Sequence, residues 1–174
     1  MFKSFTLLMM ISGLLAGCAT GPQKIAIQAS LDRSQAQTLL SEGTNTIRGS
    51  ALIRQRAGGV VSCAGRDVVL IPETAYASER MQALYGNTQR GYNPAFGGRR
   101  VNLENGDSAD YAKLTKRTQC DAQGFFKFEK IANGNFYVAT VINWQVSDYF
   151  QEGGSLMQRV SVSNGEVKEI VLAP

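Results

Sequence analysis

Short stretches in which hydrophobic and polar residues alternate dominate the chain from Thr44 onward. The clearest stretch places five residues on one side of an extended segment: Phe136, Val138, Thr140, Ile142 and Trp144. Because successive side chains of a strand point to opposite faces, this period of two predicts a β-strand with one face in the core. Shorter stretches of the same kind predict further strands: 47–53, 66–71, 126–128, 156–163 and 166–172.

Turn signals separate these predicted strands. Asp121-Ala122-Gln123-Gly124 and Asn133-Gly134 are typical of tight turns, and Asn164-Gly165 is expected to join the last two strands. Short strands at this spacing, without an internal repeat, predict an all-β sandwich formed by residues 44–174.

Three segments depart from the alternation. Ala77, Met81 and Leu84 recur at i, i+4 and i+7 with Gly86 after them, which predicts one short helix. Residues 18–43 predict an N-terminal tether, within which Ser30 and Gly43 are the candidate ends of another short helix. Residues 85–110 are rich in glycine and have no sustained period, so we expect a long loop insertion. The segment 111–119 is then expected to return as a strand.

The first residues have the organisation of a signal peptide. Lys3 precedes an almost unbroken apolar run over residues 5–15, which is too short to span a bilayer as a helix. The ending Leu15-Ala16-Gly17-Cys18 resembles the lipobox of bacterial lipoproteins. An ordinary secretory signal with a chance cysteine is the alternative.

The lipobox resemblance implies a specific processing route. Residues 1–17 would be removed, and Cys18 would carry diacylglycerol and an amide-linked acyl chain such as palmitate. Ala19, not Asp, follows Cys18, so the signal for retention in the inner membrane is missing. We therefore expect a protein anchored in the outer membrane, facing the periplasm.

Composition narrows the chemistry that the domain can perform. The chain has 174 residues and a formal charge of +4 spread along its length, which gives no signature of nucleic-acid binding. It contains no histidine, which excludes Ser-His and Cys-His catalysis as well as histidine-ligated zinc. We expect no metal and no cofactor.

Cys63 and Cys120 remain once Cys18 is lipidated. Two thiols in an oxidising compartment predict one disulfide. Two free buried thiols or a metal-binding pair are the alternatives, and two cysteines without histidine make a poor zinc site.

Several stretches resemble the carboxypeptidase regulatory-like domain. The resemblance is carried by Thr118-Gln119-Cys120-Asp121-Ala122-Gln123-Gly124-Phe125-Phe126-Lys127-Phe128, by Gly134-Asn135-Phe136-Tyr137-Val138, and upstream by Ile47-Arg48-Gly49-Ser50-Ala51 and Val68-Val69-Leu70-Ile71-Pro72. Asn133 departs from the family, which usually has proline before the second glycine. The resemblance implies a transthyretin-like (prealbumin-like) Greek-key sandwich that carries no catalytic residues of its own.

The insertion contains the candidate binding residues. Tyrosine and arginine dominate binding hot spots, and long loops on rigid sandwiches often carry function. The candidates are Tyr85, Arg90, Tyr92, Phe96, Arg99 and Arg100. The alternative is that the aromatic rings cover the base of the loop and the arginines are solvated. Asp107 and Asp110 in the same insertion could bind Ca²⁺, but their spacing misses the EF-hand pattern.

Two functions are compatible with these features. The first is a non-enzymatic, lipid-anchored binding or scaffold module of the cell envelope, with a protein or glycan partner. The alternative is a carbohydrate- or peptidoglycan-associated module, with or without hydrolytic activity. Trp144 lies on the predicted core face, so by itself it does not favour carbohydrate binding.

Overall fold

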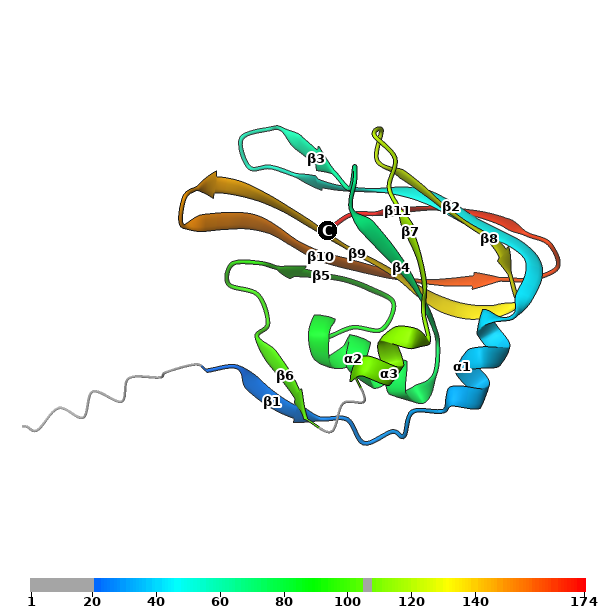
Figure 1. Ribbon diagram of the computed structural model, residues 1–174. Coiled ribbons are helices and arrows are strands. Elements are labelled where there is room, and N and C mark those ends of the chain that lie inside the picture. Colours follow the sequence, from blue (N-terminus) through cyan, green and yellow to red (C-terminus); the bar gives the residue numbers. More distant parts are fainter. Residues whose placement is uncertain (1–20, 105–107) are drawn as a thin grey trace, which may run out of the picture.

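Two β-sheets pack face to face in the computed structural model, which describes residues 21–104 and 108–174 (Figure 1). Helices α2 and α3 lie against the outer face of one sheet, and a two-stranded ribbon runs below them (Figure 1). The predicted β-sandwich is thus confirmed, with a helical layer added on one side.

The larger sheet has five strands in the order β5-β10-β9-β4-β7, and all neighbouring pairs are antiparallel. Its strands are β4 (Asp67–Pro72), β5 (Arg90–Pro94), β7 (Lys116–Gln119), β9 (Gly134–Ser147) and β10 (Phe150–Val162). The long β9–β10 hairpin forms its centre (Figure 1).

The second sheet is built around the long strand β2. β11 pairs with β2 in parallel, whereas β8 and β3 pair antiparallel with successive parts of it. Its strands are β2 (Glu42–Arg54), β3 (Val60–Ser62), β8 (Phe125–Ile131) and β11 (Val167–Leu172).

The main core fills the space between the sheets, where the predicted alternation places it. On β9, the side chains of Phe136, Val138 and Ile142 are fully buried, and Trp144 is partly buried against the same cluster. Ile47 on β2 and Phe126 on β8 face them from the other sheet. Burial of alternate apolar residues on both sheets supplies the main driving force for the fold.

A second, smaller core lies between the five-stranded sheet and the helical layer. It consists of Ile71, Ala77, Met81, Tyr137 and Met157. The predicted helix is α2 (Ala75–Tyr85), capped by the Thr74 side chain and followed by Gly86 in the left-handed conformation.

The N-terminal segment from Gln23 onward is packed rather than free, which differs from the expected tether. β1 (Gln23–Ala26) pairs in parallel with β6 (Val101–Glu104), and α1 (Arg33–Leu40) follows. The Asp32 side chain, not that of Ser30, caps α1 by accepting from the Gln35 amide. The predicted signal peptide and Cys18 lie outside the described residues.

The expectation of a loop over residues 85–110 was wrong, and the strand expected over 111–119 is confirmed only for its second half. The insertion forms the edge strand β5, the ribbon strand β6 and the start of α3 (Ser108–Lys113), and the following strand β7 is only four residues long. β5 was missed because its short sequence, with a glycine and a proline, forms a strand through hydrogen bonds to β10, which no local pattern reveals.

Asn164-Gly165 does join the last two strands, but these strands do not pair with each other. β10 belongs to the five-stranded sheet, and β11 crosses to the other sheet to pair with β2. The turn therefore connects the two layers of the sandwich.

The disulfide between Cys63 and Cys120 is confirmed, with a Cα–Cα distance of 5.8 Å. Cys63 follows β3 in one sheet and Cys120 follows β7 in the other, so the bond ties the two sheets together. Just beyond it, the Asp121 carboxylate accepts from the amides of Gln123 and Phe125, forming the predicted turn with Gly124 at a φ of 85°.

Candidate functional site

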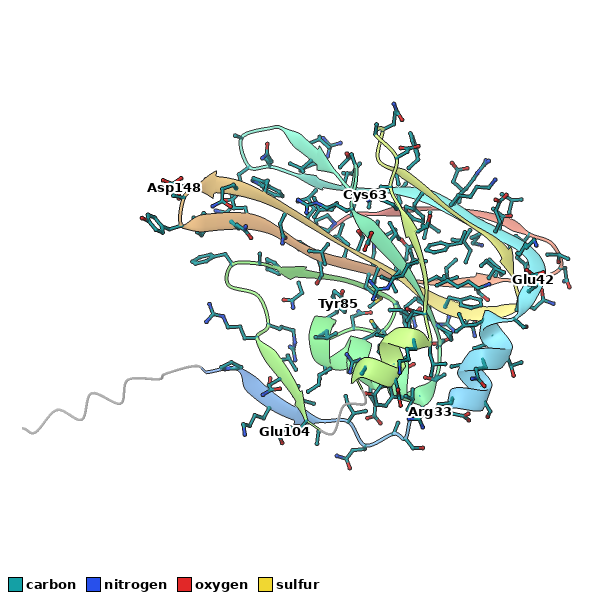
Figure 2. All side chains as sticks on the ribbon, viewed as in Figure 1. Arg33, Glu42, Cys63, Tyr85, Glu104 and Asp148 are labelled. Atoms are coloured by element: carbon teal, nitrogen blue, oxygen red, sulfur yellow. A yellow bond between two sulfur atoms is a disulfide. The ribbon has the colours of Figure 1, made fainter. Side chains whose placement is uncertain are left out.

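A cleft of about 520 Å³ lies at one end of the sandwich, where the sheets separate. The end of β2 forms one side, and β5, β9 and β10 form the other. Figure 2 labels Asp148 at the tip of the β9–β10 hairpin, which marks this end of the molecule. The charged and aromatic residues that line the cleft are Arg54, Arg56, Tyr92, Phe96, Trp144, Phe150 and Glu152.

Glu152 stands at a position where the strand pattern would place an apolar residue. It pairs across the strands with Trp144, whose ring packs against the main core. Directly paired residues of antiparallel strands share one face, so Glu152 lies on the inward face of β10. A carboxylate at an inward position, next to the last aromatic residue of the core, is typical of a functional site.

Two glycines after Glu152 shape the floor of the cleft. A Cβ atom on Gly153 would lie 2.0 Å from the Ile142 carbonyl oxygen, and one on Gly154 would lie 2.3 Å from that of Asn93. Glycine therefore allows β10 to run tightly between its neighbours. The Gly153 carbonyl accepts from the Tyr92 hydroxyl and from the Ala95 amide, both at 2.9 Å.

Tyr92 contacts the floor of the cleft and lies in the electric field of the Glu152 carboxylate. Its ring packs against the main core, and its hydroxyl is held by Gly153. Burial raises the pKa of Tyr92, and the negative charge of Glu152 raises it further. The phenol thus stays neutral near the carboxylate at physiological pH.

The charged side chains of the cleft are unpaired. Within the described part of the chain, Glu152, Arg54 and Arg56 make no salt bridge and no side-chain hydrogen bond. By contrast, the partly buried Glu73 carboxylate receives two bonds of 2.7 Å from Arg159. The cleft therefore offers a carboxylate and two guanidinium groups to a ligand.

Exposed aromatic rings stand at the mouth of the cleft. Phe96 is 68% exposed and meets Phe150 edge to face, with 5.1 Å between the ring centroids. Tyr149, at the hairpin tip, is fully exposed. Large exposed aromatic residues gathered beside a cleft mark a contact surface.

The six candidate binding residues of the insertion lie in different parts of the structure. Tyr92 and Phe96 lie in the cleft. The Arg99 guanidinium donates to the Ala83 carbonyl at 3.0 Å, near the end of α2, and Arg90 donates to the Val171 carbonyl at 3.1 Å.

The other two candidates lie elsewhere. Tyr85 packs against the second core, and burial raises its pKa. Arg100 is exposed next to the ribbon, and its carbonyl oxygen accepts from the Gln23 amide at 2.7 Å.

Sequence reasoning missed the larger part of the cleft. Trp144 was expected in the core and does pack there, yet it also lines the cleft. Glu152, Phe150, Arg54 and Arg56 were not identified. The signal was present in one place, where Glu152 and two glycines precede the alternating apolar residues of β10.

The proposed calcium ligands do not form a described site. Asp107 lies outside the described residues, and Asp110 accepts from Arg33 at 2.7 Å and from Lys113 at 3.3 Å. These bonds lower the pKa of Asp110. No group of three or more metal-ligating side chains occurs in residues 21–104 and 108–174, and no helix there has the length and apolarity to cross a bilayer.

Comparison with known proteins establishes the fold more firmly than the function. No family model matches the sequence, and no curated protein matches it significantly. A solved structure from Pseudomonas aeruginosa, described as a "putative carbohydrate binding protein", is similar with a TM-score of 0.69 and 21% identity. The match covers 84% of this chain and 99% of that one. At this identity the two chains share a fold.

Proposed function

We propose that this protein is a non-enzymatic, lipid-anchored binding module of the cell envelope and that its cleft binds carbohydrate. The observation that carries the proposal is the unpaired Glu152 carboxylate on the inward face of β10, set between Trp144 and Tyr92. Ligand sites combine apolar rings with a few convergent polar groups, and this cleft has both.

The chemistry of the cleft suits sugars. Aromatic rings offer flat apolar surfaces on which the C–H face of a sugar ring can stack, and Trp144, Tyr92 and Phe150 supply them. A carboxylate accepts hydrogen bonds from sugar hydroxyls, as Glu152 is free to do. The description of the structurally similar Pseudomonas aeruginosa protein supports the same class of ligand.

The composition of the cleft favours binding over hydrolysis. Most glycoside hydrolases use a pair of carboxyl groups that flank the scissile bond. Glu152 is the single acidic side chain among the residues that line the cleft. A single acidic side chain next to aromatic rings can orient a sugar but lacks the second acidic side chain that such hydrolysis requires.

The anchor would hold the domain close to the membrane. The lipobox resemblance supports acylation of Cys18, removal of residues 1–17 and an outer-membrane location facing the periplasm. Strand β1 begins at Gln23, five residues after Cys18. Five residues span at most about 18 Å, so the domain would sample glycans near the membrane surface.

We also propose that the sandwich is of the transthyretin-like, carboxypeptidase regulatory-like type. The stretch that carries the resemblance, 118–128, forms the end of β7, the Asp121 turn and the start of β8. This segment connects the two sheets.

Binding of oligosaccharides to the full-length protein, purified from membranes in detergent, tests the carbohydrate proposal. Wild-type protein should bind saturably to oligosaccharides of the envelope, including peptidoglycan fragments, and Trp144→Ala should weaken binding at least about tenfold, a loss of about 1.4 kcal/mol. Phe125→Ala is the matched control, because Phe125 is 57% exposed on the other sheet, away from the cleft. Equal loss in both variants, or no binding by wild type, would refute the proposal.

A further inference from the structure

We propose that the carbohydrate bound in the cleft is anionic and that Arg54 and Arg56 bind its acid group. This inference rests on the proposed function and assigns the class of glycan. The sugar ring lies against the aromatic side of the cleft, and its carboxylate or phosphate reaches the arginines on the opposite side.

The two arginines are held in place by a tight hairpin. Arg54 ends β2 and pairs with Val60 of β3, and Arg56 lies in the turn between these strands. The turn is closed by the Gln55 amide, which donates to the Gly59 carbonyl at 2.8 Å, and by the Gly58 amide, which donates to the Gln55 carbonyl at 3.0 Å. The backbone that carries both guanidinium groups is therefore ordered before a ligand arrives, which lowers the cost of binding.

Charge is distributed unevenly across the cleft. Arg54 and Arg56, which are both exposed, line the β2 side of the cleft, whereas its acidic side chain, Glu152, belongs to the facing sheet. Neither arginine has an ion-pair partner among the described residues. Water solvates both exposed arginines in the free protein, and an acid group on the sugar would give them an ion-pair partner that a neutral sugar does not supply.

Arginine has the geometry for this task. Its planar guanidinium group binds carboxylate and phosphate through two parallel hydrogen bonds. Glu152 needs only hydroxyl donors, which the same sugar supplies. An anionic sugar thus matches all three charged side chains at once.

The size of the cleft sets the length of glycan that it can hold. At about 520 Å³ it falls within the range of pockets that hold small ligands. The bound unit is therefore a short segment of a glycan, with further residues of the polymer extending past Phe96 and Tyr149 at the mouth.

Calorimetric titration of the full-length protein in detergent with three matched probes tests the inference. The probes are a trisaccharide of galacturonic acid, the neutral trisaccharide of galactose, and the galactose trisaccharide carrying one phosphate. Wild type should bind at least one acidic probe about tenfold more tightly than the neutral one. Raising salt from about 0.1 M to about 1 M, which shortens the screening length from about 10 Å to about 3 Å, should narrow this gap. Comparison of the two acidic probes identifies carboxylate or phosphate as the preferred group.

Variants that replace arginine with glutamine test whether the cleft causes the preference for acidic probes. Arg54→Gln with Arg56→Gln should lower the affinity for the acidic probe until it equals that for the neutral probe. Arg48→Gln with Arg117→Gln removes the same charge from exposed positions outside the cleft and should preserve the selectivity. If the first double variant has a lowered unfolding midpoint, Arg56→Gln alone, in the turn, provides the comparison.

The outcomes separate this inference from the proposed function. Equal affinity of wild type for acidic and neutral probes would overturn the inference and leave carbohydrate binding intact. Selectivity that survives in the Arg54/Arg56 variant would also overturn it. If no probe and no envelope oligosaccharide binds, the proposed function fails, and the inference fails with it.

Discussion

At the scale of single residues, Asn45 shows how one polar side chain connects two turns. It is fully buried on the inward side of β2. Its side-chain amide donates to the Ile131 carbonyl and to the Asn133 side chain, and its oxygen accepts from the Glu166 amide, each at 2.9 Å. Asn133, where the domain family that the sequence resembles usually has proline, also accepts from the Asn164 amide at 3.0 Å. The departure from the family pattern is thus part of a satisfied network.

Replacing Asn45 should therefore be costly. Asn45→Ala leaves the part-buried Glu166 amide and the Ile131 carbonyl with one partner fewer, and we expect a loss of about 2–3 kcal/mol of unfolding free energy. Thr44→Ala, at the exposed neighbouring position, should change it by less than about 0.5 kcal/mol. Urea unfolding followed by circular dichroism measures both. A loss below about 1 kcal/mol for Asn45→Ala would show that the network contributes little.

At the scale of elements, prediction from sequence succeeded where the two faces of a strand differ. β2 buries alternate residues from Asn45 to Ile53, and β9 buries the alternate residues Phe136, Val138, Thr140 and Ile142, so the period of two identifies both strands. β5 has no such contrast and the alternation of β6 covers only four residues, and both form through pairing with β10 and β1. The cleft was missed for a related reason. Its residues come from the ends of strands that are distant in sequence, and only their pairing brings Trp144, Glu152 and Tyr92 together.

The disulfide also connects separate elements, because it joins an edge of one sheet to an edge of the other. Its half-cystines are 57 residues apart and both are buried in the main core. Changing both Cys63 and Cys120 to alanine should lower the unfolding free energy by about 4 kcal/mol in the chain-entropy estimate. The far-ultraviolet circular dichroism of the variant should remain that of a β-protein, because the strands of Phe126 and Phe136 supply most of the core. An unchanged urea midpoint would contradict this role.

At the scale of the whole molecule, only five residues separate Cys18, the proposed site of lipidation, from the start of β1. Figure 1 shows β1 beginning on the same side of the view as the β9–β10 hairpin tip. The domain that we propose to bind glycans would therefore work close to the membrane.

Cell fractionation tests the anchor. We expect wild type in the outer-membrane fraction and Cys18→Ala released from membranes, because the acceptor thiol for the lipid is gone. Ala19→Asp keeps the thiol and restores the inner-membrane retention signal of the lipoprotein family, so this variant should stay membrane-bound in the inner-membrane fraction. Membrane attachment of Cys18→Ala equal to that of wild type would exclude lipidation as the anchor.

Nuclear magnetic resonance titration of the labelled full-length protein with an envelope oligosaccharide tests the central claim most directly. Trp144 is the single tryptophan of the chain, so one indole N–H signal reports on the cleft. The account predicts saturable shifts of this signal and of the Tyr92, Glu152 and Gly153 amides. Saturable shifts confined to other surfaces, such as the outer face around Phe125, or no shifts at all with the oligosaccharides tested, would contradict it.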